Sequence, residues 1–289
     1  MPTLCGLRRR GYPAASLRLF SDRIGISKQN SLIDFSVLEN CVRETLDESA
    51  ERRMAVVHPV KLVITNLPGD HVEQLSMSNH PKNEACGKRH VPFSNELWID
   101  AEDFMETPVA GYHRLTQGSE VRLLGVCIVK CDNVVFDGGA VKELHCTLDL
   151  ESRPGMEGSK RKVKGTIHWV CAKHAVAAEF RLFDRLFTVE NPDNEEGGGN
   201  YKDYLNPLSL QVANGFVEPV AADASPEQCF QFERQGYFVA DRHAHGAGHV
   251  LRPCAPVALL ATTVDMGQDG RAAADPERIV AGRGRRFRT

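Results

Sequence analysis

The feature that most constrains how this chain of 289 residues can fold is a series of short segments after Met54 that are rich in Val, Ile, Phe and Thr. Such segments, divided by turn signals, are typical of β-strands. They span residues 56–65, 97–100, 121–131, 134–136, 141–150, 163–171, 177–187 and 216–219. No helical stretch suited to a parallel crossover lies between them, and Asp137-Gly-Gly139 predicts a hairpin turn. We therefore expect antiparallel barrels or sandwiches rather than a doubly wound sheet.

Two amphipathic helices are predicted before the first strand. Residues 13–25 carry apolar side chains at helical spacing, with a proline at the start and a glycine at the end. A second helix is expected from Ser36, which forms a capping-box pattern with Glu39, to about Asp47. The order of elements is therefore helices first and then strands.

Composition excludes several classes of protein. The chain has 42% hydrophobic residues, which is enough for buried cores, but no apolar run of the length that spans a bilayer. Its nine cysteines include no CxxC pair, which argues against a disulfide framework and against a zinc ribbon, so no metal site is predicted. We expect a cytoplasmic monomer without a membrane partner.

Charge is distributed unevenly along the chain. The formal net charge is only -3, yet the first 30 residues hold six basic side chains against the single acid Asp22. Residues 271–289 are also basic, with six arginines against Asp275 and Glu277. Local basic patches on a nearly neutral chain are typical of a selective nucleic-acid surface.

Several polar side chains have the chemistry needed to bind unpaired bases. Arg52 stands where the last helix meets the first strand, Arg114 precedes a turn, and Arg122 opens a strand. Gln231 and Arg234 belong to an alternating stretch, but strict alternation places them on opposite faces. Arginine and glutamine suit base edges and phosphates, whereas an isolated surface arginine is also commonly solvated or salt-bridged, so spacing alone does not select these residues.

Three runs of sequence carry a family resemblance: Lys164–Val170, Arg181–Phe187 and Phe230–Phe238. Together they resemble the carboxy-terminal, anticodon-holding half of bacterial glutaminyl-tRNA synthetase, and the resemblance extends from Met1 to about Met266. The His-Ile-Gly-His-like and Lys-Met-Ser-Lys-like motifs of class I catalytic domains do not occur in this sequence. The resemblance therefore implies a module with no catalytic residues and no cofactor of its own, ATP and Mg²⁺ belonging to the parent enzyme.

The resemblance also implies a division of the chain. Residues 1–52 correspond to a helical connecting subdomain, residues 53–157 to a proximal anticodon-binding barrel and residues 158–248 to a distal one. The segment 249–264 is a candidate for completing the proximal barrel. Residues 265–289 lack periodic hydrophobicity and are expected to form a disordered basic tail.

Roles for individual residues follow from the resemblance alone. Arg122 matches the arginine that meets the first anticodon base, and Arg114 matches the one that meets the third. Three residues match positions around the central uridine, namely Arg52, Gln231 and Arg234. Four residues match the region that touches the inside corner of the tRNA, namely Ser27, Lys28, Gln29 and Asp34. For Gln29 and Asp34, a polar turn with a helix cap is an equally open interpretation.

The sequence departs from the family pattern at three positions near these sites. Gly111 stands where the pattern has a glutamine, Leu124 where it has an arginine, and His113 where a lysine is usual. Loss of one hydrogen bond to a charged partner costs about 1.5–3 kcal/mol, so these changes bear on specificity more than on fold.

Three functions remain open from the sequence. The chain is either the tRNA(Gln)-binding portion of a glutamine ligase whose catalytic domain lies elsewhere, for example on a separately encoded polypeptide, or a free-standing tRNA-binding module, or a protein-interaction scaffold. A working ligase would show ATP-dependent activity and a binding module would not, and because the nucleotide motifs are absent we expect none from the isolated chain. Steep salt dependence of RNA binding would separate the first two from the third.

Overall fold

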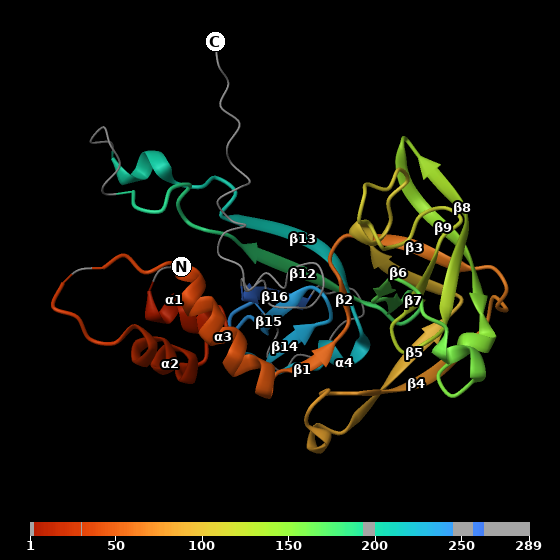
Figure 1. Ribbon diagram of the computed structural model, residues 1–289, viewed down its shortest axis with the longest axis horizontal. Coiled ribbons are helices and arrows are strands. Elements are labelled where there is room, and N and C mark those ends of the chain that lie inside the picture. Colours follow the sequence, from red (N-terminus) through yellow and green to blue (C-terminus); the bar gives the residue numbers. More distant parts are fainter. Residues whose placement is uncertain (1–2, 30, 193–199, 245–256, 263–289) are drawn as a thin grey trace, which may run out of the picture.

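The chain folds into a small group of N-terminal helices followed by two curled β-sheets (Figure 1). The computed structural model describes residues 3–29, 31–192, 200–244 and 257–262. The helices are α1 (Leu4–Arg9), α2 (Ala14–Ile24), α3 (Phe35–Ser49) and the short α4 (Pro219–Ala222). Single 3-10 turns occur at Glu84–Cys86, Ala101–Asp103, Leu150–Ser152, Glu157–Lys160 and Tyr201–Tyr204. The prediction of a mainly β chain with helices first is confirmed.

The two large sheets, here called sheet A and sheet B, each have seven strands. Sheet A runs in the order β1 (Glu51–Arg53), β14 (Cys229–Phe232), β15 (Gly236–Ala240), β16 (Val257–Thr262), β12 (Val176–Phe183), β13 (Leu210–Val217) and β2 (Ala55–Val56). Sheet B runs in the order β10 (Thr166–Ile167), β7 (Glu120–Leu123), β8 (Ile128–Asp137), β9 (Ala140–Asp149), β3 (Pro59–Ile64), β6 (Glu96–Asp100) and β11 (Val170–Cys171).

Pairing within the sheets is mixed rather than wholly antiparallel. The pairs β1–β14 and β12–β16 are parallel in sheet A, and β10–β7 and β9–β3 are parallel in sheet B. Strand β16, from the segment expected to complete the proximal barrel, pairs with β12 and β15 in sheet A. The domain boundaries drawn from the sequence stay a prediction.

The two edges of each sheet are consecutive pieces of chain. In sheet A the edge strands β1 and β2 are separated by Met54, and in sheet B the edge strands β10 and β11 are separated by His168 and Trp169. A flat seven-stranded sheet would hold its edges far apart, because neighbouring strands lie about 4.8 Å from each other. Each sheet must therefore curl until its edges meet, which gives both a barrel-like form.

One short segment is shared by both sheets. Ala55 and Val57 pack in the hydrophobic core of sheet A, whereas Met54 and Val56 pack in the core of sheet B. The side-chain alternation of an extended segment delivers successive residues to opposite sides. The segment that closes sheet A therefore also contributes two side chains, Met54 and Val56, to the core of sheet B.

The N-terminal helices cover the outside of sheet A. Helix α3 buries Leu38, Val42 and Leu46 in a cluster with Tyr237 of β15. The helix begins at Phe35, and its cap is Asp34, which accepts a hydrogen bond of 2.7 Å from the backbone N–H of Ser36. The predicted cap at Ser36 was two residues late, because a short polar side chain on either side of the boundary satisfies the same pattern. Among the helices that the structure describes, none is long and apolar enough to cross a membrane.

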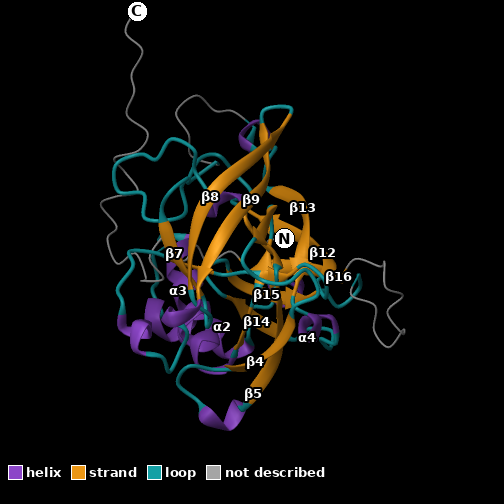
Figure 2. Ribbon diagram, turned by 90° about the vertical axis from the view of Figure 1, so that its right-hand side faces the viewer, coloured by secondary structure: helices purple, strands orange, loops and turns teal. Residues whose placement is uncertain are grey.

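A two-stranded hairpin projects from sheet B at residues 72–94, where the sequence predicted no strand. Strands β4 (Val72–Ser78) and β5 (Lys88–Ser94) pair antiparallel, and the hairpin points away from the body of the molecule (Figures 1 and 2). Strand β4 was not predicted because it lies at the surface and no side chain along it is fully buried. Without a buried face, a strand lacks the hydrophobic alternation that identifies it.

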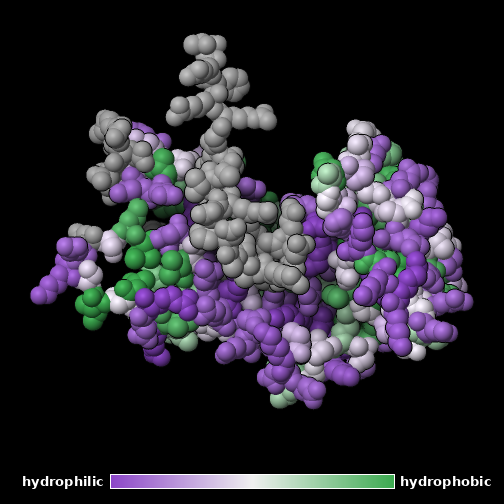
Figure 3. All heavy atoms as spheres, viewed as in Figure 1, coloured by the Kyte–Doolittle hydropathy of each residue, from purple (hydrophilic) through white to green (hydrophobic). Residues whose placement is uncertain are grey.

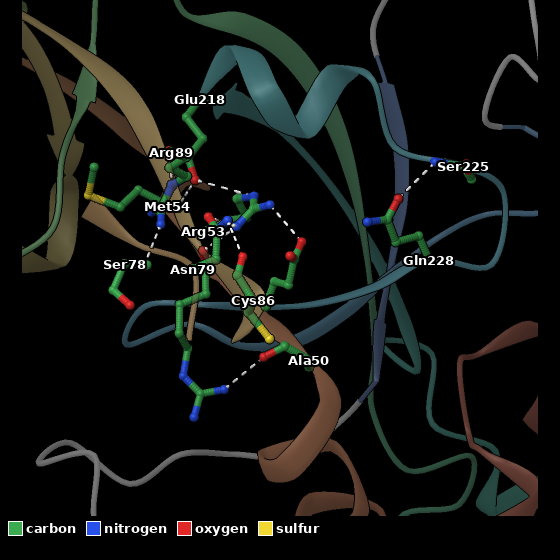
Figure 4. Close-up of polar contacts among 12 residues, drawn as sticks. Ala50, Arg53, Met54, Ser78, Asn79, Cys86, Arg89, Glu218, Ser225 and Gln228 are labelled. Atoms are coloured by element: carbon green, nitrogen blue, oxygen red, sulfur yellow. Dashed lines mark hydrogen bonds and ion pairs between the residues drawn. The ribbon is translucent and has the colours of Figure 1, made fainter. Parts of the chain in front are cut away.

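A buried ionic cluster attaches this hairpin to sheet A. Glu218, at the start of α4, accepts hydrogen bonds from Arg89 of β5 at 2.9 Å and from the backbone N–H of Met54 at 3.0 Å. Arg53 lies 3.9 Å from the same carboxylate and donates to Asn79 at 2.9 Å. Figure 4 shows both arginines turned toward Glu218. A buried carboxylate with several charged and backbone donors is compensated for its loss of water.

The predicted hairpin turn at Asp137-Gly-Gly139 is confirmed. Asp137 pairs with Ala140, so Gly138 and Gly139 form a two-residue loop, with φ of 59° and 87°. Left-handed φ at both central residues is the mark of the turn that suits hairpins. The glycine tract at 197–199 and the tail 265–289 lie outside the described residues.

Sheets A and B also meet through a buried carboxylate. Asp100, at the end of β6, accepts hydrogen bonds from the backbone N–H of Val57 at 3.1 Å and from Gln235 at 2.7 Å. Burial raises the pKa of Asp100 to about 6, the Val57 N–H opposes that rise, and the nearby charge of Asp103 adds to it. Trp98 stacks on Phe216 beside this contact, with ring centroids 4.9 Å apart.

Because sheet A closes tightly at Gly215, a methyl group added there should destabilise the folded protein. A Cβ at Gly215 would lie 2.0 Å from the carbonyl oxygen of Val56, whereas a Cβ at Gly69 would meet open space. We expect Gly215→Ala to lower the free energy of unfolding by about 1–3 kcal/mol, because backbone must move to admit it. Urea denaturation measures this, and Gly69→Ala is the matched control. Equal stability of the two variants would contradict the closure.

Asp100 predicts a pH dependence of stability. Its folded pKa of about 6 lies above the value of 3.8 for an ordinary aspartate. The folded state therefore holds the proton of Asp100 more tightly than the unfolded state does. The protonated carboxyl contributes fully to stability below about pH 4, and this contribution is lost as pH rises through 6. We expect Asp100→Asn to be more stable relative to wild type at pH 7.5 than at pH 4, with a difference on the order of 2 kcal/mol. Thermal melts at both pH values measure it, and a pH-independent difference would contradict the assignment.

Candidate nucleic-acid interface

Two predicted site residues converge on one buried carboxylate. Arg234 donates to both carboxylate oxygens of Asp103, at 2.7 and 3.0 Å, and Nε of Arg114 lies 3.4 Å from Oδ1 of the same residue. Arg234 comes from the turn between β14 and β15 in sheet A, whereas Asp103 and Arg114 belong to the part of the chain that forms sheet B. Residues far apart in the sequence thus form one cationic site where the sheets meet.

The backbone at Arg234 is unusual. Its φ is 66°, a left-handed conformation that is uncommon for residues other than glycine, asparagine and aspartate. The turn is closed by a hydrogen bond of 3.0 Å from the N–H of Gln235 to the carbonyl of Phe232. Such strain persists where surrounding contacts hold it, and here the two-point pairing with Asp103 does so.

Both arginines keep donors that no group among the described residues uses. Arginine carries five N–H donors. Arg114 directs Nε to Asp103 and Nη1 to the carbonyl of Glu102 at 3.2 Å, and its Nη2 has no protein partner in the part of the chain that the structure describes. The side chains of Arg114 and Arg234 are 23% and 24% exposed. They can therefore reach an external acceptor while remaining fixed by Asp103.

Neighbouring groups set the charge of this site. His168 is buried with its ring nitrogens 3.8 Å from Asp100 and from Asp103. Burial, followed by the positive charge of Arg234, lowers the pKa of His168 to about 3, so its ring is neutral at physiological pH. Burial raises the pKa of Asp103, whereas Arg234 and Arg114 oppose that rise. The arginines are therefore the groups that balance the charge of Asp103.

Arg52 and Gln231 form a second group. They are register partners in the parallel pair β1–β14, and both are buried. Arg52 donates to Asp47 at 2.8 Å and to the carbonyl of Ala50 at 3.3 Å, which ties it to the end of α3. Gln231 lies in β14 and Arg234 in the turn that follows it, but Arg52 is bonded to Asp47 of α3 whereas Arg234 is bonded to Asp103.

Arg122 is held separately by a loop. Its guanidinium donates to three carbonyl oxygens, those of Ser152 at 3.2 Å, Ser159 at 3.1 Å and Arg161 at 2.9 Å. These contacts fasten the loop after β9 onto β7. No hydrogen bond or ion pair among the described residues joins Arg122 to either of the other groups. In this conformation Arg122 has fewer donors available than Arg114.

Of the three positions that depart from the family pattern, Gly111 has a backbone conformation that favours glycine. Gly111 has a φ of 88°, and the turn that contains it is closed by a hydrogen bond of 3.0 Å from the N–H of Tyr112 to the carbonyl of Val109. A glutamine there would be strained. Leu124 packs against the core of sheet B, and its carbonyl accepts a hydrogen bond from Trp169 at 3.0 Å. His113 is exposed.

The four residues of the predicted inner-corner contact lie at the loop between α2 and α3. Ser27, Lys28, Gln29 and Asp34 are all exposed. Ser27 accepts a hydrogen bond of 3.1 Å from the backbone N–H of Gln29, and Asp34 is the cap of α3. The same loop exposes Ile26 and Leu32, and on the face drawn in Figure 3 apolar side chains gather at this helical end of the molecule.

Asp103, the residue that organises the site, was not predicted from the sequence. An acidic side chain just after a strand is usually solvated, and nothing in the neighbouring sequence indicates its burial. Within the described residues, no group of three or more His, Cys, Asp and Glu side chains is arranged to hold a metal ion.

Comparison with known proteins gives a consistent result. Residues 50–149 and 166–241 each match a family described as the anticodon-binding domain of class I (E and Q) tRNA synthetases. Glutamine–tRNA ligase from Xanthomonas euvesicatoria pv. vesicatoria (strain 85-10) is 63% identical over 248 residues, which are 86% of this chain and 43% of that protein. Glutamine–tRNA ligase from Xylella fastidiosa (strain M12) is 61% identical over 250 residues, again 86% of this chain and 43% of that protein. The chain thus spans less than half the length of these relatives.

The two matched regions contain all of the residues that form the site around Asp103 and the pair of Arg52 and Gln231. Their chemistry, arginine and glutamine held on strands and tight turns, is suited to unpaired bases. The chain belongs to the anticodon-binding domains of the class I (E and Q) tRNA synthetases.

Proposed function

We propose that this chain binds the anticodon loop of tRNA(Gln) and presents that tRNA to a catalytic domain that is not contained in this sequence. The observation that carries the proposal is the convergence of Arg114 and Arg234, from different sheets, on Asp103, with guanidinium donors left exposed. Similarity to glutamine–tRNA ligases supports glutamine as the amino acid of the cognate tRNA.

The proposed contacts divide into reading and positioning. Base edges would be read by the residues that the family resemblance assigns, namely Arg52, Arg114, Arg122, Gln231 and Arg234. Phosphates or sugars at the inner corner would be met by Ser27, Lys28, Gln29 and Asp34. Contacts to phosphates place an RNA without reading its sequence, whereas contacts to base edges discriminate.

The chemical step is proposed to lie outside this chain. ATP-dependent glutaminylation would need ATP and Mg²⁺ bound by a nucleotide-binding domain, either elsewhere in the same polypeptide or on a separate one. The protein would then act as a monomer in the cytoplasm, where tRNA is charged. Its own side chains would orient the anticodon and supply no bond-making group.

Salt dependence tests whether the chain binds RNA at all. Filter binding of the full chain to a tRNA(Gln) transcript should weaken linearly in a plot of log affinity against log salt, because each neutralised phosphate releases counterions. For a single-stranded loop the slope is about −0.7 for each phosphate contact. Absence of binding, or binding without salt dependence, would contradict the proposal and favour a surface for proteins.

Removal of Arg114 tests whether the site reads a base. We expect Arg114→Ala to weaken binding of the cognate transcript roughly tenfold, because a hydrogen bond to a charged donor is lost. Binding of a transcript with a substituted third anticodon base should weaken much less. Lys28→Ala is the control, since loss of a phosphate contact should weaken both transcripts equally. If Arg114→Ala also affected both equally, Arg114 would be a phosphate contact.

A further inference from the structure

The carboxylate of Asp103 balances two positive charges that would otherwise repel each other. Arg234 and Arg114 both approach Oδ1, at 2.7 and 3.4 Å, and Arg234 also pairs with Oδ2. Asp103 is 1% exposed, so its ionised form needs partners from the protein. His168 contributes no charge at neutral pH, and Asp100 is a second acid. Asp103 therefore needs the two arginines to be ionised in its buried position, and it in turn fixes the positions of their guanidinium groups.

Each arginine is held in a way that leaves a defined edge for a ligand. Arg234 uses its two terminal nitrogens on Asp103, in a two-point pairing that restricts rotation of the guanidinium plane. Arg114 is held at Nε by Asp103 and at Nη1 by the carbonyl of Glu102, which leaves Nη2 available. A donor that is fixed before the ligand arrives loses less entropy on binding.

We infer that Asp103 is a positioning residue that fixes Arg114 and Arg234 together, so that the two sheets read neighbouring anticodon bases as one unit. The inference rests on the proposed function and deepens it. Asp103 does not itself contact the RNA. It acts through the arginines, one from each sheet, and a change at one of them reaches the other through the shared carboxylate.

This role predicts an effect opposite in sign to simple electrostatics. Asp103 is a negative charge near a polyanion, so its removal should strengthen RNA binding if only net charge mattered. If Asp103 positions the arginines, its removal frees both side chains and weakens binding. The neighbouring Glu102 separates the two effects. Its side chain is exposed and, within the described residues, forms no hydrogen bond or ion pair with either arginine. Only its backbone carbonyl takes part, by accepting a hydrogen bond from Arg114.

The experiment compares Asp103→Asn with Glu102→Gln in the full chain. Each variant removes one negative charge and keeps the size of the side chain. Affinity is measured for the tRNA(Gln) transcript and for one with a substituted third anticodon base. We expect Asp103→Asn to bind the cognate transcript about tenfold more weakly and to lose discrimination between the two, whereas Glu102→Gln should bind equally or more tightly, within about twofold.

A third variant guards against loss of folding. Asp103 is buried, so thermal melting of each variant is recorded, and Arg234→Lys is measured alongside. Lysine keeps the positive charge but cannot make the two-point pairing. We expect Arg234→Lys also to weaken the cognate transcript and to reduce discrimination against the third-base substitution, which Arg114 is proposed to read.

The outcomes separate the inference from the proposed function. Failure of the wild-type chain to bind the transcript would overturn both. Salt-dependent binding by wild type, combined with equal or tighter binding by Asp103→Asn, would overturn the positioning role alone. Should Asp103→Asn fail to fold, unchanged discrimination by Arg234→Lys would overturn it in the same way.

Discussion

The segment from Met54 to Val57 is the constraint on which the rest of the structure depends. Its side chains enter the cores of sheet B and sheet A in turn, so neither sheet can close without fixing the other. The N–H of Val57 binds Asp100 of β6, which also accepts from Gln235 in the β14–β15 turn. Placement of that turn against the end of β6 then brings Arg234 to Asp103. The geometry of the candidate interface is thus a consequence of the segment Met54–Val57, which contributes side chains to the cores of both sheets.

The carboxylates of Asp100 and Asp103 are buried where the two sheets meet, and their burial costs stability although packing of the sheets does not require them. Burial raises the pKa of both Asp100 and Asp103, which means that each is harder to ionise than in water. An apolar pair could join the sheets as well, as Trp98 and Phe216 do beside them. Buried charged groups that cost stability are commonly functional, and here Asp103 holds two arginines that keep exposed donors.

The parts of the fold with a clear hydrophobic period were predictable from sequence, and the parts that depend on long-range pairing were not. Helix α2 and the glycine turn at 138–139 follow from local pattern. Strand β4 could not be recognised, because it buries no face. Arg114, Gln231 and Arg234 were named from a family resemblance, whereas Asp103 was missed, since its main partner, Arg234, lies 131 residues further along the chain. The carbonyl partners of Arg122 could not be predicted either, because any residue type can supply a backbone carbonyl.

If the chain reads an anticodon as proposed, the departures from the family pattern would leave more of the recognition to the side chains held where the two sheets meet. Gly111 offers no side chain, and its backbone at φ 88° disfavours a glutamine, so the polar group usual there cannot be restored without strain. Leu124 is engaged with the core of sheet B. The residues that the family resemblance assigns to the central base are Arg52, Gln231 and Arg234, and only Arg234 among them is not buried. With fewer groups available to bind bases, accurate placement of each guanidinium would matter more, and a fixed carboxylate behind Arg114 and Arg234 is one way to obtain it.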